Sequence, residues 1–361
     1  MRKFLFVLPS DDMGGAEGVQ QSLAKHLIKE GHDVRVLILT RARTNAWSSF
    51  GERISYLNTG SVYVGLLLLL TYRFGGTFDL VFSSQVYVNG ALGLLRKLGV
   101  LKTKYLILRE STSVFLRYPK GLKRMSFTTF YKLGYRNSDL VIHQSKRMLT
   151  QLKDSLPELS NLNHQVIPNP IDLVEVRELA DHPADLPNFQ FILGVGRLIH
   201  AKGYDIAIKA FATLTKTHPD LHYVILGDGN LKEELMELGE SLGIAERLHF
   251  LGHVANPFPY MKAARLCVMS SRIEGYPNVL LQMLALNPHV MSTNCAGGVD
   301  ELPLHGVAPT DDVDGLLNQM NQALLGPPLN AEEVERELQS RGPGKFMEQI
   351  MEYLTVSPEG K

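Results

Sequence analysis

Cysteine is scarce in this sequence of 361 residues, which contains only Cys267 and Cys295. One lies in an apolar run and one in a turn-like stretch, so they indicate neither the disulfide framework of a small secreted protein nor a cysteine-based metal site. The longest apolar run, Val62–Leu70, is far shorter than the roughly 20 residues that a membrane-spanning helix needs. The first apolar run ends within Phe4–Leu8 and predicts a strand rather than a signal peptide. We therefore expect a protein of the reducing cytoplasm that does not cross a bilayer.

Net charge is also absent, since 37 Lys and Arg balance 37 Asp and Glu. The balance conceals a division between the two halves. Residues 1–165 hold 23 basic and 11 acidic residues, whereas residues 166–361 hold 14 basic and 26 acidic residues. A basic half is attracted to an anionic membrane surface or an anionic acceptor, by about 1 kcal/mol per well-placed cation. The alternative is that two domains simply differ in surface composition.

Length and composition favour two α/β domains. The chain is too long for one comfortable core, and its 45% hydrophobic residues and 31 glycines are ordinary for an α/β enzyme. Short apolar runs alternate with longer amphipathic stretches, which is typical of βα units in a parallel sheet. The strands predicted for the first half are Phe4–Leu8, Val34–Thr40, Ile54–Leu57, Leu80–Ser83, Tyr105–Leu108, Leu140–His143 and Gln165–Ile167.

The segment Pro168-Asn169-Pro170 interrupts regular structure, because proline lacks an N–H donor and restricts the residue before it. We place the linker here, so that residues 1–168 form the first domain and residues 169–340 the second. Residues 341–361 are predicted to form a C-terminal helix that could pack back on the first domain. The strands predicted for the second domain are Phe191–Val195, Tyr223–Gly227, Leu248–Leu251, Leu266–Met269 and Val290–Ser292.

A glycine-rich loop, Asp11–Glu17, follows the first predicted strand and opens a helix. Ligands of open parallel sheets bind beyond the carboxyl ends of the strands, so residues in this position are candidates for a site. The paired glycines Gly14 and Gly15 let the backbone approach a ligand, and free N–H groups at a helix start favour an anion. A tight turn alone would also use these glycines, and the G-x-G-x-x-G dinucleotide spacing is absent.

Two basic residues, Arg197 and Lys202, follow the first strand of the second half, which ends at Gly194-Val195-Gly196. A planar guanidinium and a compact ammonium placed past one strand can converge on a diphosphate and stabilise its departure. In isolation, a solvated surface loop would explain the same pair.

Glu274 stands beside the predicted start of another helix. The stretch Ser270–Ala285 follows an apolar strand, and Pro277 suits the first turn of a helix whose N–H groups near Gly275 to Asn278 point at an anion. A carboxylate beside an anion site would repel the anion, so Glu274 is expected to have a role of its own. Glu274 is free to accept hydrogen bonds from sugar hydroxyls.

Together these motifs resemble the family 4 retaining glycosyltransferases of the GT-B fold. The resemblance runs from the Gly14-Gly15 loop through Gly196-Arg197, Lys202-Gly203 and Ser270–Ala285 to the segment Gly297–Leu302. It implies two Rossmann-like domains that face each other across a deep cleft. It also implies that a sugar is transferred from a nucleotide diphosphate, with retention and without a metal.

The resemblance assigns roles to individual residues. As catalytic residues it implies Arg197 and Lys202 on the diphosphate and Glu274 on the hydroxyls of the donor sugar. Gly14 and Gly15 would close over the donor from the first domain. The full set of donor-binding residues that it implies is Gly14, Gly15, Gly196, Gly275, Tyr276, Pro277, Asn278, Val279 and Gln282.

Two positions depart from the family's pattern. Gln282 replaces the second glutamate of the family's Glu-x7-Glu motif, which usually holds the ribose hydroxyls; an amide offers one acceptor oxygen where a carboxylate accepts from both hydroxyls. This change leaves the nucleotide preference open. After the strand Tyr105–Leu108, some relatives place a histidine near the acceptor, whereas this chain has Arg109 and Glu110. Either residue could serve the acceptor, or the two could form an ion pair at the strand end.

Two acidic motifs, Asp11-Asp12 and Asp311–Asp314, imitate the metal motif of other glycosyltransferases. The first lies in a glycine-rich loop, and the second begins a helix, where acids suit the positive end of the dipole. We expect no metal and no other cofactor, because Arg197, Lys202 and the helix N–H groups supply positive potential. The expected donor is a UDP-sugar rather than a GDP-sugar.

The acceptor is expected on the basic first domain, where cations alternate with aromatic residues between positions 109 and 136. This pattern suits a membrane interface and a lipid-linked phosphate, although a helix with its aromatics inward and its cations in water is equally consistent. No RNA-module motif supports nucleic-acid binding. The run Val62–Leu70 favours a buried crossover helix over one that dips into a leaflet. The residues of the pattern are Arg109, Phe115, Arg117, Tyr118, Lys120, Lys123, Arg124, Phe127, Phe130, Tyr131, Lys132 and Arg136.

The sequence therefore predicts a retaining glycosyltransferase that moves a hexosyl or acetamidohexosyl group to a lipid-linked or polysaccharide acceptor, in the cytoplasm or on the inner face of the membrane. A nucleotide-sugar epimerase or hydrolase of the same fold is one alternative, and it would release nucleotide without an acceptor. A nicotinamide oxidoreductase would share the wound sheets, but this chain lacks the dinucleotide-binding fingerprint G-x-G-x-x-G. A non-catalytic sugar-nucleotide binding protein would bind the donor without turnover.

Overall fold

The computed structural model describes residues 1–41, 46–58 and 60–355, which form two compact units. Unit 1 combines Met1–Pro170 with the chain from Pro343 onward, and unit 2 is Ile171–Gly342. The chain thus passes between the units twice, within two residues of each boundary placed from the sequence. None of the helices in the described ranges has both the length and the apolar character needed to span a bilayer.

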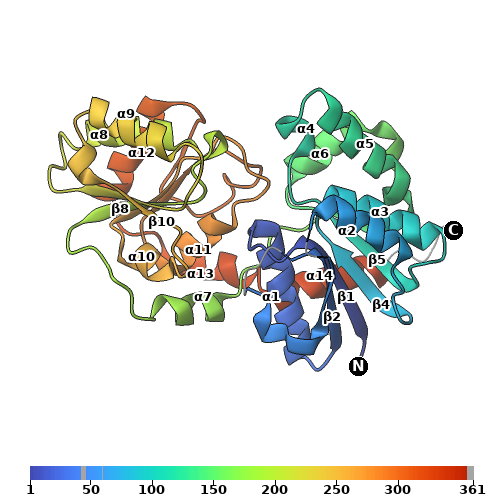
Figure 1. Ribbon diagram of the computed structural model, residues 1–361. Helices are drawn as coiled ribbons and strands as arrows, with labels where there is room; N and C mark the ends of the chain where they lie inside the picture. The colour runs from blue at the N-terminus through green and yellow to red at the C-terminus, as the bar shows by residue number, and fades with distance from the viewer. Residues whose placement is uncertain (42–45, 59, 356–361) are drawn as a thin grey trace. The chain divides into compact units, whose positions relative to one another are not determined.

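Unit 1 is built on a parallel sheet, which has seven strands in the described residues, in the order β3-β2-β1-β4-β5-β6-β7 (Figure 1). All seven strands predicted from the first half of the sequence are present. They are β1 (Lys3–Ser10), β2 (Asp33–Thr40), β3 (Ile54–Asn58), β4 (Phe78–Ser83), β5 (Thr103–Arg109), β6 (Leu140–His143) and β7 (His164–Val166). The helices are α1 (Gly15–Lys29), α2 (Val62–Thr71), α3 (Val86–Lys97), α4 (Val114–Arg117), α5 (Leu122–Gly134), α6 (Lys146–Ser155) and α14 (Pro343–Thr355).

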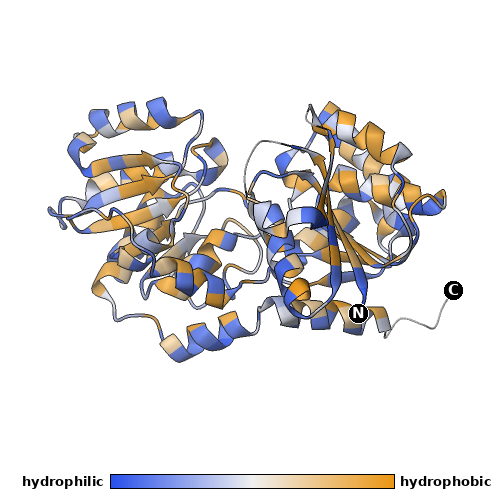
Figure 2. Cartoon of the chain, turned by 60° about the horizontal axis from the view of Figure 1, so that its bottom comes forward, coloured by the Kyte–Doolittle hydropathy of each residue, from blue (hydrophilic) through white to orange (hydrophobic). Residues whose placement is uncertain are grey.

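Alternating side chains of the sheet feed two cores, one on each face. Along β1, Phe4, Phe6 and Leu8 pack in the core covered by α1 and α14, whereas Leu5 and Val7 pack in the core covered by α2, α3 and α6. This alternation follows from the two-residue period of a strand. Figure 2 shows the result, since the strands are orange along their length while most helices change between blue and orange.

The C-terminal helix α14 belongs to the core of unit 1, although it follows unit 2 in the sequence. Its buried residues Phe346, Met347, Ile350 and Leu354 lie in the same apolar cluster as α1. The spacing of three to four residues places these side chains on one face of the helix. The packing ties the end of the chain to the unit that contains its beginning.

Unit 2 repeats the wound architecture on a parallel sheet, whose order over the described ranges is β10-β9-β8-β11-β12-β13. Five of these strands were predicted, and the two-residue strand β13 was missed because its apolar run is too short to recognise. The strands are β8 (Phe191–Val195), β9 (His222–Leu226), β10 (Leu248–Gly252), β11 (Leu266–Met269), β12 (Val290–Thr293) and β13 (Val307–Ala308). The helices are α7 (Leu173–Ala180), α8 (Tyr204–Leu214), α9 (Lys232–Ser241), α10 (Phe258–Ala263), α11 (Asn278–Leu286), α12 (Val313–Leu325) and α13 (Ala331–Gln339).

Candidate functional site

The carboxyl ends of β8 and β11 meet at the centre of the unit 2 sheet. The chain leaves β8 toward β9 on one side, and it later returns through β11 on the other side, so the winding direction reverses between these two strands. Such a reversal leaves a crevice at the carboxyl edge, which is where open α/β sheets bind ligands. The predicted residues Gly196, Arg197, Lys202 and Glu274 all follow β8 or β11 directly.

Glycines hold the turn after β8 against its neighbours. Gly196 has φ +152°, and a Cβ there would lie 3.3 Å from Lys202 Cε, so the lysine side chain passes directly over this residue. Gly203 has φ +62°, and a Cβ there would lie 2.1 Å from the carbonyl oxygen of Ser270. Both positions therefore need glycine, for conformation and for space. The turn that carries Lys202 is pressed against the end of β11 as a result.

Lys202 and Glu274 form an ion pair at this edge. Lys202 Nζ donates to Glu274 Oε1 at 2.5 Å, and Ser271 Oγ donates to the same oxygen at 2.8 Å. Both charged side chains are partly exposed, so each can also reach a ligand. The side chain of Arg197 is exposed and makes no hydrogen bond or ion pair with the described part of the chain. The site thus offers two cations and one oriented carboxylate.

Helix α11 begins beside Glu274 and points its first N–H groups at the same edge of the sheet. The helix starts at Asn278, and Pro277 precedes it as the N-cap with φ −84° and ψ 92°. The prediction that Pro277 occupies the first turn differs from this helix start by one residue, and the positive end of the helix dipole still lies at this edge of the sheet. Gln282 lies one turn further along α11 and is half-buried.

Arg272 fixes the loop between β11 and α11. Its guanidinium forms a bidentate pair with Asp205 at 2.7 Å for each nitrogen, and it also pairs with Asp311. These two carboxylates come from α8 and from the turn before α12. A planar guanidinium suits such a fixed, bidentate geometry. The clamp holds the loop that carries Glu274, which accounts for Arg272, a residue that the motifs left without a role.

A second glycine-containing loop reaches the site and was missed from the sequence. After β9 the chain runs Gly227-Asp228-Gly229, and a Cβ at Gly227 would lie 2.1 Å from the carbonyl oxygen of Gly196. Gly229 approaches the carbonyl oxygen of Leu198 equally closely, at 2.2 Å. The signal was present as Gly-x-Gly that begins at the last residue of the predicted strand Tyr223–Gly227. The loop supports the backbone on which Arg197 stands.

Tyr276 faces away from a ligand at this edge. Its ring is buried, and its hydroxyl accepts a hydrogen bond from Arg341 at 2.7 Å. Burial raises the pKa of this phenol to about 12. The side chain of Tyr276 is therefore engaged within unit 2, and its contact with a donor stays a prediction.

In unit 1, the Gly14-Gly15 loop lies at the equivalent reversal between β1 and β4. Gly14 is the N-cap of α1 and lacks a side chain to cap it, so the first N–H groups of α1 face the carboxyl edge of the sheet. A Cβ at Gly14 would lie 2.6 Å from Oε2 of Glu17, whose other carboxylate oxygen accepts a hydrogen bond from Gln85 at 3.3 Å. A larger residue at position 14 would therefore displace the Glu17 carboxylate.

Arg109 and Glu110, predicted as acceptor-side residues, are buried inside unit 1. The guanidinium of Arg109 pairs with Asn169 and reaches Ser84 Oγ at 3.4 Å, and the carboxylate of Glu110 accepts hydrogen bonds from the hydroxyls of Tyr131 and Tyr135. Burial raises the pKa of Glu110 to about 7 and lowers the pKa of Arg109 to about 10. Direct contact with an acceptor does not fit this arrangement, because neither side chain reaches the surface. The sequence could not show that two tyrosines would enclose the carboxylate.

The acidic motifs have structural partners. Asp11 is buried and accepts a hydrogen bond from Tyr56 at 3.2 Å, and Asp312 caps α12 by accepting from the N–H of Gly315 at 2.9 Å. Asp311 pairs with Arg272, as described above. Over the residues that the structure describes, no three His, Cys, Asp or Glu side chains gather closely enough to hold a metal ion.

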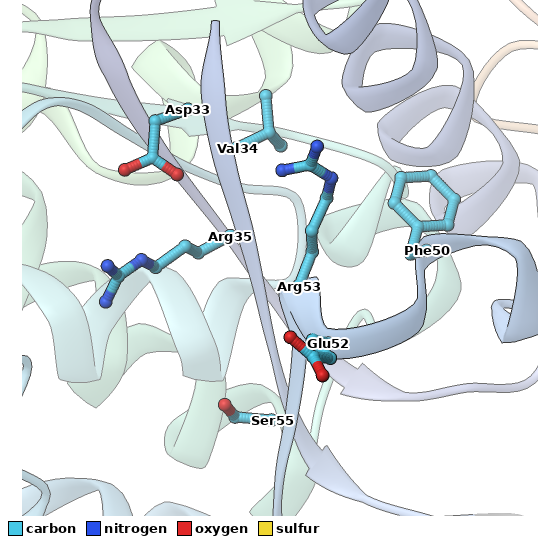
Figure 3. A pocket seen from close by; sticks show the side chains of 7 residues that line it. All are labelled: Asp33, Val34, Arg35, Phe50, Glu52, Arg53 and Ser55. Carbon is cyan, nitrogen blue, oxygen red and sulfur yellow. The ribbon is translucent and has the colours of Figure 1, made fainter.

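An open hollow of about 530 Å³ lies elsewhere, at the amino ends of β2 and β3 in unit 1 (Figure 3). Asp33 and Arg35 project from one side of β2, and the hollow is completed by Phe50, Glu52 and Arg53. Its two acidic and two basic side chains balance each other. It occupies the end of the sheet opposite to Gly14, so we do not assign the predicted chemistry to it.

The sequence matches the models of two known protein families. Residues 13–175 match the model of Glycosyltransferase Family 4, and residues 178–339 match that of Glycosyl transferases group 1. Together the two matches cover both units. The chain belongs to the group 1, family 4 glycosyltransferases. The family predicted from the Gly14-Gly15, Gly196-Arg197 and Glu274 motifs is therefore confirmed.

Two relatives of this family 4 glycosyltransferase come from Campylobacter jejuni. The N-acetylgalactosamine-N,N'-diacetylbacillosaminyl-diphospho-undecaprenol 4-alpha-N-acetylgalactosaminyltransferase is 34% identical over 58% of this chain and 56% of its own length. A GalNAc-alpha-(1->4)-GalNAc-alpha-(1->3)-diNAcBac-PP-undecaprenol alpha-1,4-N-acetyl-D-galactosaminyltransferase is 27% identical over 88% of this chain and 84% of its own length. The chain spans about half the length of curated relatives such as the first of these two.

The solved structure of Anabaena HepE in complex with UDP has the same fold. It is 19% identical, covers 98% of this chain and 100% of its own, and has a TM-score of 0.74. At this identity the likeness concerns the fold alone. It confirms the GT-B fold that the sequence predicted, with two Rossmann-like domains.

Proposed function

We propose that this chain is a retaining, metal-independent glycosyltransferase that moves a hexosyl or acetamidohexosyl group from a UDP-sugar to a lipid-linked saccharide. The observation that carries the proposal is the Lys202–Glu274 pair at the reversal between β8 and β11, beside the amino end of α11. Family membership supports glycosyl transfer. The Campylobacter relatives, whose names specify undecaprenol-linked acceptors, support a lipid-linked acceptor.

In the proposed mechanism, the bond between the anomeric carbon and the β-phosphate oxygen breaks, and its electron pair stays on the departing nucleoside diphosphate. Arg197, Lys202 and the first N–H groups of α11 stabilise that developing charge. The acceptor hydroxyl attacks the anomeric carbon from the face that the diphosphate leaves, and its proton passes to the departing phosphate oxygen. Glu274 accepts hydrogen bonds from the sugar hydroxyls and holds the ring for this attack.

A lipid-linked acceptor would place the working enzyme on the inner face of a membrane as a peripheral protein. The basic character of residues 1–165 supports this placement, since anionic lipid headgroups attract cations. The donor and the acceptor would then reach the protein from water and from the bilayer respectively.

Donor specificity is tested first by a thermal-shift screen of UDP-, GDP- and ADP-sugars. We expect UDP-sugars to raise the unfolding midpoint most, and a larger shift with GDP-sugars would contradict the proposed base. Transfer is then measured with an undecaprenyl diphosphate-linked saccharide. Nucleotide release that is equally fast without this acceptor would identify a hydrolase or epimerase instead, and donor binding without any turnover would identify a non-catalytic binding protein.

Metal independence is a separate prediction. Because Arg197, Lys202 and the start of α11 are proposed to supply the positive potential, transfer should proceed at an unchanged rate in excess EDTA. A rate that falls with EDTA and returns with Mg²⁺ or Mn²⁺ would refute this part of the proposal.

A further inference from the structure

Helices α2 and α3 lie on one face of the unit 1 sheet, and α5 packs against α3 (Figure 1). Helix α3 packs against both of the others, and its Gly90 and Gly93 let α5 approach so closely that a Cβ at Gly93 would lie 2.1 Å from the carbonyl oxygen of Gly134. The three helices therefore form one continuous layer. We call the side of this layer that faces away from the sheet the outer helical face.

The outer helical face exposes large apolar side chains. The sequence favoured burial of the run Val62–Leu70, and this prediction is wrong, because only Gly65 and Leu69 of α2 are buried. Tyr63 is 81% exposed and Leu67 is 66% exposed. The exposed apolar residues of α2 and α5 are Tyr63, Val64, Leu67, Leu68, Leu70, Leu122, Met125 and Leu133. An apolar stretch as uniform as α2 leaves no polar face to turn toward water.

The chain around these helices carries an excess of positive charge, although Lys132 of α5 pairs with Glu158 and Arg96 of α3 pairs with Asp139. Residues 53–138, which include α2, α3 and α5, contain 13 Lys and Arg but only two carboxylates, Asp79 and Glu110. Glu110 is buried, and Asp79 accepts a hydrogen bond from the backbone N–H of Lys3. Lys120 and Lys123, beside the exposed Leu122, are exposed, and Lys123 Nζ lies 5.4 Å from the centre of the Tyr118 ring. Nearly all of the positive excess of the basic half therefore comes from this stretch.

We propose that the outer helical face binds an anionic phospholipid bilayer, with the exposed leucines of α2 entering the acyl region and the lysines at the start of α5 contacting the headgroups. A protein partner fits less well. Protein interfaces carry about one hydrogen bond per 100–200 Å², whereas the exposed side chains of α2 offer only the hydroxyls of Tyr63 and Thr71. Aliphatic side chains framed by cations match the two layers of a bilayer surface. The inference deepens the proposed function, because a bilayer holds the lipid-linked acceptor.

The test is flotation of the full chain with vesicles of phosphatidylglycerol and phosphatidylcholine. We expect co-flotation that falls at high salt and is lost with phosphatidylcholine alone. The double variant Leu67→Glu/Leu70→Glu should lower the bound fraction by about tenfold or more, since it places two charges in the acyl region. Leu325→Glu is the matched control, because Leu325 is 77% exposed on unit 2, and this variant should float like the parent chain. Unchanged unfolding midpoints verify that the variants are folded.

A second pair of variants tests the electrostatic part. Lys120→Gln/Lys123→Gln should weaken binding to the anionic vesicles, whereas Lys216→Gln, an exposed lysine of unit 2, should not. The proposal is overturned if the parent chain does not float, if Leu67→Glu/Leu70→Glu floats like the parent, or if this variant only abolishes a dimer seen by size exclusion. UDP-sugar thermal shifts of the same variants should match those of the parent. A parent chain that floats but binds no nucleotide sugar would refute the proposed function and leave this inference standing.

Discussion

At the scale of single residues, the decisive feature is that Lys202 and Glu274 are paired across 72 positions of sequence. An isolated lysine beside a carboxylate is common on protein surfaces and contributes little. Here both residues follow the two central strands at which the winding reverses, Gly196 leaves space beside the lysine side chain, and Gly203 lets the turn approach Ser270 at the end of β11. The pairing therefore results from backbone geometry as well as from charge.

Lys202→Ala removes the cation next to the proposed leaving group. We expect kcat to fall by roughly 100-fold or more, because one lost electrostatic contact to a developing charge typically costs this much. Arg197→Ala should lower kcat by a similar factor, whereas Lys216→Ala on the surface of unit 2 should leave kcat unchanged. Acceptor-dependent transfer at saturating donor measures all three. Near-normal turnover in both variants would contradict the roles assigned to Arg197 and Lys202.

Gln282→Glu restores the carboxylate that the family usually places on α11. If Gln282 lies against the ribose, the variant should bind UDP about tenfold more tightly, since a carboxylate accepts from both hydroxyls. Calorimetry with UDP and with 2′-deoxy-UDP checks this, because the gain should largely vanish when one hydroxyl is missing. Gln322→Glu on the exposed side of α12 is the control. Equal affinity for UDP in parent and variant would place the ribose elsewhere.

At the scale of elements, the contact between α3 and α5 shows how a helical layer is assembled. Gly90, Gly93 and Gly134 remove the side chains at the crossing, so the two backbones touch. The same contact places Tyr131 and Tyr135 of the α5 region over Glu110, at the end of β5. Close helix packing thus decides that the predicted acceptor residue is buried.

Gly93→Ala tests this crossing. A Cβ there would lie 2.1 Å from backbone oxygen, which cannot move aside cheaply, so we expect the free energy of unfolding to fall by about 1–3 kcal/mol. Gly18→Ala is the matched control in a helix, since its nearest neighbour would be 3.9 Å away. That variant should be neutral or up to about 1 kcal/mol more stable, because alanine favours helix. Urea unfolding followed by circular dichroism compares them, and equal effects would contradict the close approach.

At the scale of the whole molecule, each unit has its own pair of cores, and the C-terminal helix completes a core of unit 1. The stability of the unit that begins the chain therefore depends on residues at its end. The predicted two-domain division describes the sheets correctly, but it is the packing of α14 that makes unit 1 discontinuous in sequence.

Ile350→Ala and Leu338→Ala form a reciprocal test of this arrangement. Both side chains are fully buried, in α14 and α13 respectively, so each variant should lose about 2–5 kcal/mol. Hydrogen exchange should increase in β1 and α1 for Ile350→Ala and in α11 for Leu338→Ala, because these elements share the respective cores. Increased exchange in β1 for both variants would show that the units do not unfold separately.

Much of the fold was determined by the sequence itself. Short apolar runs such as Phe4–Leu8, and the turn residues that bound them, depend on local sequence, so the described strands of both sheets except β13 could be predicted. The motifs Gly196-Arg197, Lys202-Gly203 and Glu274 with the following helix start were likewise visible, because each is a short segment placed just after a strand.

Only the tertiary structure decided which side chains are accessible. Arg109 and Glu110 are polar and looked available, but both are buried, with Glu110 bonded by Tyr131 of α5 and by Tyr135. The run Val62–Leu70 is apolar and looked buried, yet only one side of α2 meets the sheet. The pairing of Lys202 with Glu274, the Arg272 clamp and the support from Gly227 also join distant segments. The accessibility and the pairing of a side chain depend on which distant segments of the chain pack against it. A local sequence pattern does not contain that information.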